Sequence, residues 1–409
     1  MDGIFRIFFK SGLERMKIFF YSMGCKLNQT LTKKYVGKSI EQGYNVCDDP
    51  QDADIILLSS CVVTDTSQKQ FETILKRMSK RFPEKKIKVI GCYDINLLNE
   101  NVEYIDQNDI FQSKKFYINR TRVEVPIQIG CNSFCSYCIV PYYRGEEKSR
   151  SIKIILKEVE DLYRNNVKEI VLTGVHIGRF SDEGKNLVDL VNLIVEKPIE
   201  RIRLSSLDIN EIDLKDIEKM AKIKKLVPFF HLSLQHISEK VLMTMKRKYN
   251  VKRIKEIMNA FKENFDRPML GCDVIVGFPF ETDRDFMEMV EFFEKSYFSH
   301  FHIFPFSKRK ESLAYYFEKV KDAEIPVERK MEIMRRLHKE KKEEFLKSLK
   351  GINETIIFES LKDDMIKGKS ERYFDGYLKY EDKFKKGDII KVKVLDFIDG
   401  KVFCEERNF

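Results

Sequence analysis

The first part of the chain alternates between short apolar runs and segments of helical periodicity. Runs rich in apolar and β-branched residues at Lys17–Tyr21, Asp54–Leu58 and Ile87–Ile90 predict strands, and a helical pattern lies around Gln68–Arg81. Such alternation is typical of a parallel sheet with crossover helices. We therefore expect an α/β domain over residues 16–120.

A second alternating series predicts six more strands with helices between them. The predicted strands are Val125–Ile129, Glu169–Thr173, Arg201–Ser205, Phe229–Leu234, Gly271–Val276 and His302–Phe306, and the helices include Ile152–Asn165, Leu187–Glu196, Val251–Asn264 and Asp283–Lys295. Six strand–helix units favour a partial (β/α)6 barrel, open on one side, over a closed eight-fold barrel. We expect this domain to span residues 121–349. Its charged end, Pro326–Lys350, predicts a solvated amphipathic helix.

Residues 350–409 carry short β-rich runs separated by glycines. Strands are predicted at Glu354–Glu359, Ile389–Phe397 and Lys401–Glu405, split by Gly368, Gly376, Gly387 and Gly400. This spacing favours a small antiparallel β-barrel that serves as a binding module. The predicted fold class is thus α/β with an appended all-β domain.

Composition narrows the possible classes of function. The chain of 409 residues has a net charge of +9, which permits a polyanionic partner without proving one. Nine cysteines without a secretion signal argue against a disulfide framework. No stretch approaches the roughly 20 apolar residues that cross a bilayer, so we expect a cytoplasmic protein without a membrane partner. A second start-like segment begins at Met16. Residues 1–15 are therefore either an upstream extension or a native part of the fold, and the sequence favours neither.

The strongest chemical signal is the cysteine motif Cys131-x-x-x-Cys135-x-x-Cys138. Three thiolates on one tight loop can hold three irons of a [4Fe-4S] cubane and leave the fourth iron open for S-adenosylmethionine (SAM). Tyr137 is placed to lie against the adenine of that ligand. The alternative is a zinc knuckle, but structural zinc needs four protein ligands, and the next histidine along the chain is His176.

Three further cysteines each follow one of the N-terminal predicted strands. Parallel strands end at one edge of a sheet, so Cys25, Cys61 and Cys92 should converge in space. Gly24 and Gly91 precede two of them and let the backbone turn tightly around an inorganic core. We interpret the trio as ligands of a second [4Fe-4S] cluster, although any one of them alone would more often be a buried structural residue. Cys47, Cys272 and Cys404 have no partners at useful spacing.

Together these motifs resemble the methylthiotransferase family of radical SAM enzymes. The resemblance covers Met16 to about Glu405 and rests on Gly24-Cys25-Lys26-Leu27-Asn28-Gln29, Ser60-Cys61-Val62-Val63-Thr64, Gly91-Cys92-Tyr93, Gly130-Cys131 through Cys138-Ile139-Val140-Pro141, Arg144-Gly145 and Ser149-Arg150-Ser151. It implies two [4Fe-4S] clusters, SAM, and a C-terminal domain similar to the RNA-binding TRAM domain.

Three stretches indicate the branch of the family, and the Gly24–Gln29 motif quoted above is one of them. Leu172–Gly178 and Arg201–Leu207 are similar to enzymes that act on threonylcarbamoyladenosine beside the anticodon. The resemblance implies that a methylthio group is attached to carbon 2 of that adenosine at position 37 of tRNA. The implied partners are the tRNA anticodon stem-loop, a reducing electron donor and a sulfur source.

Several residues outside the cysteine motifs are candidate SAM contacts. Gly174, Val175 and Ser205 follow barrel strands, where SAM contacts would lie, although ordinary barrel packing explains them equally well. Gln235 and Asp273 are expected to face the pocket, where either could instead be a satisfied core polar group. Arg150, together with Arg144, could hold a phosphate or the SAM carboxylate, although surface salt bridges would account for both. His302 is predicted to be structural.

Three departures from the family pattern predict a reshaped substrate or SAM pocket. His236 and Ile237 replace the last two residues of Gln-Ser-Gly, Phe280 replaces a glycine in Gly-Phe-Pro-Gly-Glu-Thr, and Glu311-Ser312 replaces Gly-Thr. Other hypotheses stay open. The same chemistry could act on isopentenyladenosine in tRNA or on an aspartate of a ribosomal protein, and a non-catalytic metal-containing RNA-binding protein is the alternative from another class.

Overall fold

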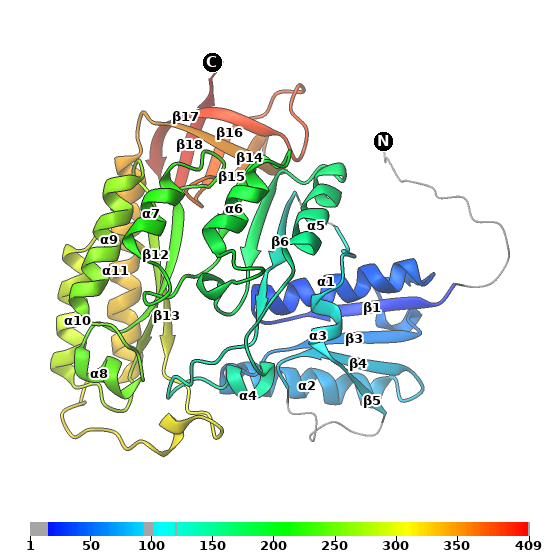
Figure 1. Ribbon diagram of the computed structural model, residues 1–409, viewed down its shortest axis with the longest axis horizontal. Coiled ribbons are helices and arrows are strands. Elements are labelled where there is room, and N and C mark those ends of the chain that lie inside the picture. Colours follow the sequence, from blue (N-terminus) through cyan, green and yellow to red (C-terminus); the bar gives the residue numbers. More distant parts are fainter. Residues whose placement is uncertain (1–14, 94–100, 119–120, 408–409) are drawn as a thin grey trace.

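The computed structural model describes residues 15–93, 101–118 and 121–407. Residues 1–14, nearly the whole of the expected upstream extension, lie outside the described residues. Figure 1 shows an N-terminal sheet, a central set of strands flanked by helices, and a small C-terminal barrel at the end opposite the N-terminal sheet. Within the described residues, no helix combines the length and apolar character that a bilayer crossing requires.

The N-terminal unit is a parallel sheet with helices on its faces. Its strands lie in the order β2 (Asn45–Val46), β1 (Lys17–Ser22), β3 (Ile55–Ser60), β4 (Lys86–Gly91) and β5 (Val102–Ile105), and its helices are α1 (Lys26–Glu41), α2 (Asp65–Arg81) and α3 (Gln107–Phe111). The central strand β3 is buried along its whole length. The edge strands β2 and β5 were not predicted, because they are short and lack a sustained apolar run.

The central unit is the predicted partial barrel of six parallel strands. Its strands are β6 (Arg122–Pro126), β9 (Glu169–Thr173), β10 (Arg201–Leu204), β11 (Phe229–Gln235), β12 (Met269–Val276) and β13 (Phe298–Pro305). Two parallel bridges, Ile202–Leu226 and Leu207–Leu232, join the two three-stranded halves. The helices are α4 (Val140–Arg144), α5 (Ile152–Arg164), α6 (Leu187–Val195), α7 (Leu214–Ala221), α8 (Glu239–Thr244), α9 (Val251–Asn264) and α10 (Asp283–Lys295).

The first barrel strand lies earlier in the sequence than predicted. β6 ends at Pro126, which has no N–H group to continue the ladder. Gln128–Ile129, the end of the expected strand, forms β7 and pairs antiparallel with β8 (Lys148–Ser149). This small ribbon leads directly into the cysteine loop.

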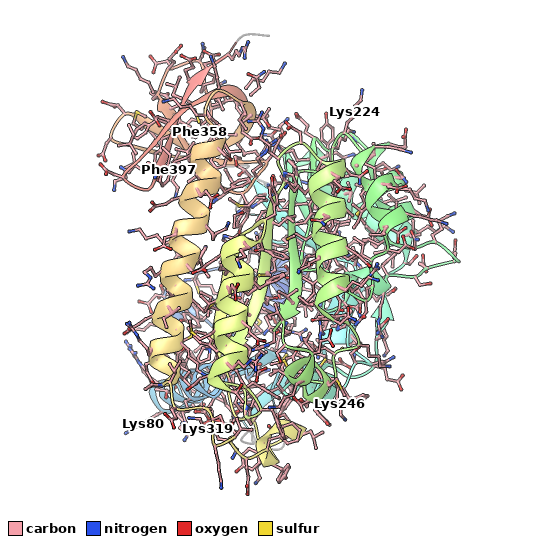
Figure 2. The ribbon with its side chains drawn as sticks, turned by 90° about the vertical axis from the view of Figure 1, so that its left-hand side faces the viewer. Lys80, Lys224, Lys246, Lys319, Phe358 and Phe397 are labelled. Carbon is pink, nitrogen blue, oxygen red and sulfur yellow. The ribbon has the colours of Figure 1, made fainter. Side chains whose placement is uncertain are left out.

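The charged C-terminal helix is half-buried rather than solvated. α11 (Val327–Ser348) packs against β13 and α10 and buries Met331, Met334 and Leu337. Figure 2 shows α11 running along the barrel toward the small C-terminal barrel, where Phe358 and Phe397 are labelled. There Phe345 and Leu346 of α11 join the core of the small barrel.

The C-terminal unit is a closed barrel of five strands. The order is β14 (Asn353–Lys362), β15 (Met365–Ser370), β16 (Asp375–Lys379), β18 (Lys401–Glu406) and β17 (Ile389–Ile398), with one parallel pair, β16–β18. Gly368 and Gly376 lie inside strands and pair with each other rather than separating strands. A Cβ atom at Gly368 would lie 2.8 Å from the Ile357 carbonyl oxygen, so the small barrel requires glycine there.

Candidate active site

The loop between β7 and α4 carries Cys131, Cys135 and Cys138. Cys131 and Cys135 are buried, and Cys138 is partly exposed. Backbone N–H groups of Ser133 and Val140 donate to the sulfurs of Cys131 and Cys138 at 3.3 and 3.4 Å. These contacts orient the thiols and stabilise negative charge on them.

Gly130 allows this loop to turn. Its φ angle is +75°, and a Cβ atom there would lie 1.9 Å from the carbonyl oxygen of Glu146. No other residue type fits without displacing the chain. The N–H group of Cys131 donates to the Gly145 carbonyl at 3.1 Å, which fixes the first cysteine against the end of α4.

The N-terminal trio lies at the carboxyl edge of the parallel sheet. Cys25 caps the start of α1, and Cys61 and Cys92 directly follow β3 and β4. The chain packs tightly here, since a Cβ atom on Gly24 would lie 3.1 Å from the Cys61 sulfur. The structure thus brings together three cysteines that are far apart in the sequence.

Arg144 and Asn28 link the N-terminal trio to the cysteine loop. Arg144 hydrogen-bonds Asn28 and Gln107, and its Nη2 atom lies 3.9 Å from the Cys25 sulfur. Asn28 donates to the Ser60 carbonyl at 2.5 Å. Burial of this guanidinium beside the thiols places a fixed positive charge where thiolates must form.

The buried cysteines repel one another's charge. Burial and the neighbouring cysteines raise the pKa of Cys92 to about 11, although Arg144 opposes the shift. Burial raises the pKa of Cys138 to about 12, and charge on Cys135, Cys131 and Cys92 adds to the effect. Bound cations would therefore favour the thiolate forms of Cys92 and Cys138, and the irons of an iron–sulfur cluster would supply such charge. Because Cys92 affects Cys138, the two trios are electrostatic neighbours.

The spacing of the sulfurs also bears on the kind of metal centre. Among the described residues, no three cysteine sulfurs all lie within 4.8 Å of one another. A tetrahedral zinc ion with bonds of about 2.3 Å holds its sulfurs about 3.8 Å apart. A cubane binds each thiolate through a different iron and so holds them farther apart. In each trio, at least one sulfur–sulfur distance therefore exceeds the spacing around a single zinc ion.

Two cavities adjoin the cysteines and contain five of the predicted SAM contacts. One is lined by Tyr137, Gln235 and Asp273, together with Cys138. The other, of about 400 Å³, is lined by Gly174 and Ser205 together with Cys25. That volume lies within the range of about 300–1,000 Å³ typical of small-molecule sites. Gln235 has a φ angle of +65°, rare for a residue with a side chain.

The other candidate contacts have different surroundings. The backbone N–H of Val175 donates to the side-chain oxygen of Gln128 at 2.9 Å. Arg150 is fully buried, where it pairs with Glu158 and donates to backbone carbonyls of Pro126 and Ser113. In the structure Arg150 therefore joins the barrel to the segment after α3.

The residues that depart from the family pattern lie near this region. His236 is fully buried, and its Nε2 atom lies 3.4 Å from Glu281. Glu281 also pairs with Lys330 of α11 at 2.7 Å. Phe280 packs edge-on against Phe317 in a cluster that includes Tyr137. Aromatic and ionic packing thus occupies positions where the pattern has small residues.

Sequence reasoning missed a second group of residues around the cysteine loop. Arg247 donates toward the Cys135 sulfur at 3.7 Å and pairs with Asp208 at 2.6 Å. Burial opposes charge on His176, but hydrogen bonds to Cys131 and Glu211 outweigh it and raise the pKa of His176 to about 10. The Val175–Gly178 stretch was the only sequence signal that pointed near this group.

Comparisons with known proteins agree with this geometry. Residues 125–293 match the model of the radical SAM superfamily, and residues 17–112 match that of the uncharacterized protein family UPF0004. The radical SAM methyltransferase TsrM of Kitasatospora setae, whose structure contains cobalamin and a [4Fe-4S] cluster, superposes with a TM-score of 0.52 at 10% identity. That superposition covers 72% of this chain and 75% of TsrM, and it shows a shared fold.

Curated relatives match over most of their length. The threonylcarbamoyladenosine tRNA methylthiotransferase MtaB of Aquifex aeolicus is 31% identical, covering 82% of this chain and 91% of the relative. The Bacillus subtilis enzyme of the same name is 31% identical over 92% and 93%. The tRNA-2-methylthio-N(6)-dimethylallyladenosine synthase of Pseudothermotoga lettingae is 28% identical over 79% and 82%. The chain is a radical SAM enzyme that belongs to the methylthiotransferase family, as its two cysteine trios predicted.

Proposed function

We propose that this enzyme converts N6-threonylcarbamoyladenosine at position 37 of tRNA into its 2-methylthio derivative. The observation that carries the proposal is the contact of Arg144, which ends the helix after the cysteine loop, with Asn28 and with the Cys25 sulfur of the N-terminal unit. Cys138 and Cys25 each line a cavity, and Asp273 of the first cavity contacts His231 and His302 of the second. This arrangement suits a reaction in which a radical formed at one trio must reach a substrate that meets sulfur at the other.

The residues of the loop fit the [4Fe-4S] cluster and SAM that the radical SAM family uses. Cys131, Cys135 and Cys138 would hold the cluster, and the Tyr137 cavity would hold SAM. When bound, these cofactors supply the electron and the radical chemistry, which side chains cannot provide. The protein orients the buried thiols through N–H donors and limits the access of water, and the bound irons would stabilise their thiolate form.

A second [4Fe-4S] cluster on Cys25, Cys61 and Cys92 is part of the proposal. Their convergence at the sheet edge, the tight approach at Gly24 and the Arg144 charge all support a bound inorganic core. A reducing electron donor and a sulfur source complete the set of partners. We also propose three domains, 16–120, 121–349 and 350–409, that act in the cytoplasm.

The tRNA anticodon stem-loop is the proposed macromolecular substrate. The ring of Tyr373 in the C-terminal barrel borders the Cys25 cavity. Four cations lie 4.9–5.6 Å from the centre of this ring: Lys26, Arg122, Arg203 and Lys369. An aromatic ring can stack on a base, and the cations around it can bind phosphates. This part of the cavity border is therefore suited to a nucleotide.

The test is nucleoside analysis of tRNA. After anaerobic reconstitution to about eight irons per chain, the enzyme with SAM and a reductant should methylthiolate tRNA that carries threonylcarbamoyladenosine. A deletion strain should lose the 2-methylthio derivative and regain it from a plasmid. Retention of that nucleoside in the deletion strain would contradict the proposal. Methylthiolation of isopentenyladenosine alone, or of a ribosomal aspartate, would reassign the substrate, and absence of iron would favour a non-catalytic RNA-binding protein.

A further inference from the structure

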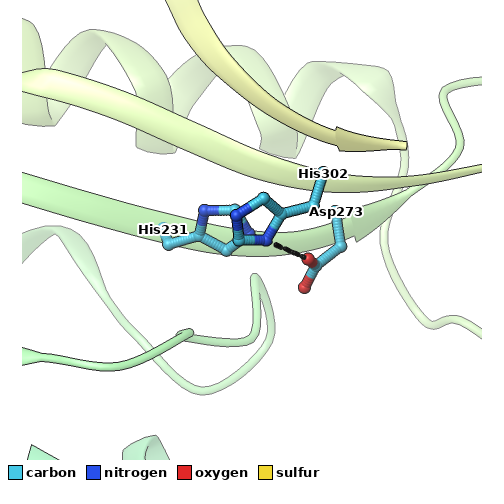
Figure 3. A group of neighbouring side chains, drawn as sticks. All are labelled: His231, Asp273 and His302. Atoms are coloured by element: carbon cyan, nitrogen blue, oxygen red, sulfur yellow. Dashed lines mark hydrogen bonds and ion pairs between the residues drawn. The ribbon is translucent and has the colours of Figure 1, made fainter. Parts of the chain in front are cut away.

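Two imidazoles and a carboxylate converge on the inner wall of the partial barrel, apart from the cysteine trios. Figure 3 shows His231, Asp273 and His302 projecting toward one another from three neighbouring strands. The Oδ1 atom of Asp273 lies 2.9 Å from His231 Nε2 and 3.3 Å from His302 Nδ1. One potential ligand atom from each residue lies within 4.8 Å of the other two.

Strand register explains this convergence. Asp273 on β12 lies directly opposite His302 on β13. His231 on β11 lies opposite Gly271, two residues before Asp273 and therefore on the same face of the sheet. A Cβ atom at Gly271 would lie 2.5 Å from His231 Nδ1, so glycine at this position makes room for the imidazole.

The charge on Asp273 is compensated by imidazoles rather than by a permanent cation. Its side chain is 19% exposed, and within the described part of the chain its ion-pair partners are the two imidazoles. The other group of similar composition differs. This second group consists of His176, Asp208 and Glu211. There Arg247 pairs with Asp208 at 2.6 Å, and Arg179 pairs with Glu211 at 2.9 Å. That second group is a neutralised ion-pair network, whereas Asp273 has no arginine or lysine partner among the described residues.

We propose that His231, Asp273 and His302 form a binding site for a divalent transition-metal ion. Two imidazoles and one carboxylate match the preferences of borderline ions such as zinc, manganese and ferrous iron. Ligand atoms about 2.0–2.2 Å from one tetrahedral ion lie about 3.3–3.6 Å apart. The 3.3 Å contact of Asp273 with His302 matches this spacing, and the 2.9 Å contact with His231 would lengthen on metal binding. His231 and His302 line the Cys25 cavity and Asp273 lines the Tyr137 cavity, so an ion held by all three would lie between the two cavities. There an oxygen anion of a bound substrate can reach the ion.

A further histidine supports the orientation of the ligands. His300 Nε2 lies 3.3 Å from His302 Nε2, so the ring nitrogen of His302 that points away from Asp273 has a partner. Metal-binding histidines usually have such a partner on the second ring nitrogen, which fixes the ring and its tautomer. His300 in turn contacts the ring of His338 on α11 at a centroid distance of 5.4 Å.

The experiment measures zinc retention by the reconstituted enzyme. Holoprotein with both clusters is equilibrated with zinc chloride, desalted, and analysed for zinc, iron and sulfide in one sample. We expect one zinc per chain with unchanged iron. Asp273→Asn preserves shape and hydrogen bonding but removes the charge, and His302→Ala removes a half-exposed ligand. Loss of a residue that only hydrogen-bonds a metal ligand costs about 10–100-fold in metal affinity. Each of these two variants changes a ligand itself, so each should lower the zinc affinity at least as much.

The matched control is Asp266→Asn, which removes the charge of an aspartate whose side chain is 80% exposed and lies outside the proposed site. This variant should retain zinc like the unchanged enzyme. Three results would overturn the proposal: no zinc retained by the unchanged protein, equal retention by His302→Ala, or zinc gained only as iron is lost. Iron content also reports whether each variant has folded. No tRNA is present, so the outcome is independent of the proposed methylthiolation.

Discussion

The Nη2 atom of Arg144 lies 3.9 Å from the sulfur of Cys25. Arg144 ends the helix after the radical SAM loop, whereas Cys25 begins the first helix of the N-terminal unit. One guanidinium therefore connects the two halves of the active site. Because it also opposes the rise in the pKa of Cys92, it favours the thiolate state that a cluster requires.

Replacing Arg144 with methionine should impair the N-terminal trio more than the cysteine loop. The change removes the positive charge and leaves Asn28 and Gln107 without their partner, which costs about 1–3 kcal/mol of stability per unpaired group. Iron per chain should fall toward half after reconstitution, while reductive SAM cleavage persists. Iron and sulfide analysis checks the first outcome, and the yield of 5′-deoxyadenosine checks the second. Arg164→Met, at an exposed arginine, is the control, and full iron content in Arg144→Met would contradict this role.

The two cysteine trios should be separable by mutation. Cys135→Ala removes a ligand of the radical SAM cluster and should abolish reductive SAM cleavage. Cys61→Ala should leave that cleavage intact but abolish methylthio transfer to tRNA, because the proposed sulfur-bearing site loses a ligand. Single-turnover assays with liquid chromatography and mass spectrometry measure both products. If Cys135→Ala still cleaved SAM reductively, the assignment of the loop would be wrong.

The sequence alone groups six cysteines into two trios, for two different reasons. The loop trio lies within eight residues, and the other trio follows strands whose parallel order places their ends together. The side chains that surround the cysteines could not be predicted in this way. Contact between Arg144 and Asn28 depends on how two units dock, and no periodic signal encodes docking.

The histidine group shows the same limit at the level of strand register. The sequence alone predicts a structural role for His302, because the sequence does not show that Asp273 lies opposite it. Only the register of β12 and β13 shows this. Conversely, Gly368 and Gly376 looked like strand breaks, but they pair within the small barrel, where a side chain would clash. A glycine in a sequence permits a turn, and only the packing around it shows whether one occurs.

The free energy of unfolding should depend on pH partly because of Lys34. Burial lowers the pKa of Lys34 to about 7, with Glu158 opposing the shift and Arg150 adding to it. In the unfolded chain lysine titrates near about 10.4. Between these values the unfolded state holds a proton that the folded state lacks, so Lys34 makes the free energy of unfolding rise with pH, by at most about 1.4 kcal/mol per pH unit.

Lys34→Met should flatten this rise. Methionine fills similar volume and leaves Glu158 paired with Arg150, so the variant should fold. Urea unfolding followed by circular dichroism at pH 7 and pH 9 measures the difference. Lys38→Met, at an exposed position on the same helix, should keep the slope of the unchanged protein. An identical slope in Lys34→Met would mean that another group causes the pH dependence.

Two glycines beside the cysteine loop offer a matched test of steric fit. Gly130 and Gly145 have similar φ angles, +75° and +68°. A Cβ atom at Gly130 would lie 1.9 Å from the Glu146 carbonyl oxygen, whereas one at Gly145 would meet no atom within 4 Å. Alanine at Gly145 should therefore cost only backbone strain, of about 1–3 kcal/mol, and leave iron binding intact. Alanine at Gly130 adds the clash with the Glu146 carbonyl to its own strain, so it should displace the loop and lower both iron content and SAM cleavage several-fold. Equal iron content in the two variants would show that the clash at Gly130 does not displace the cysteines.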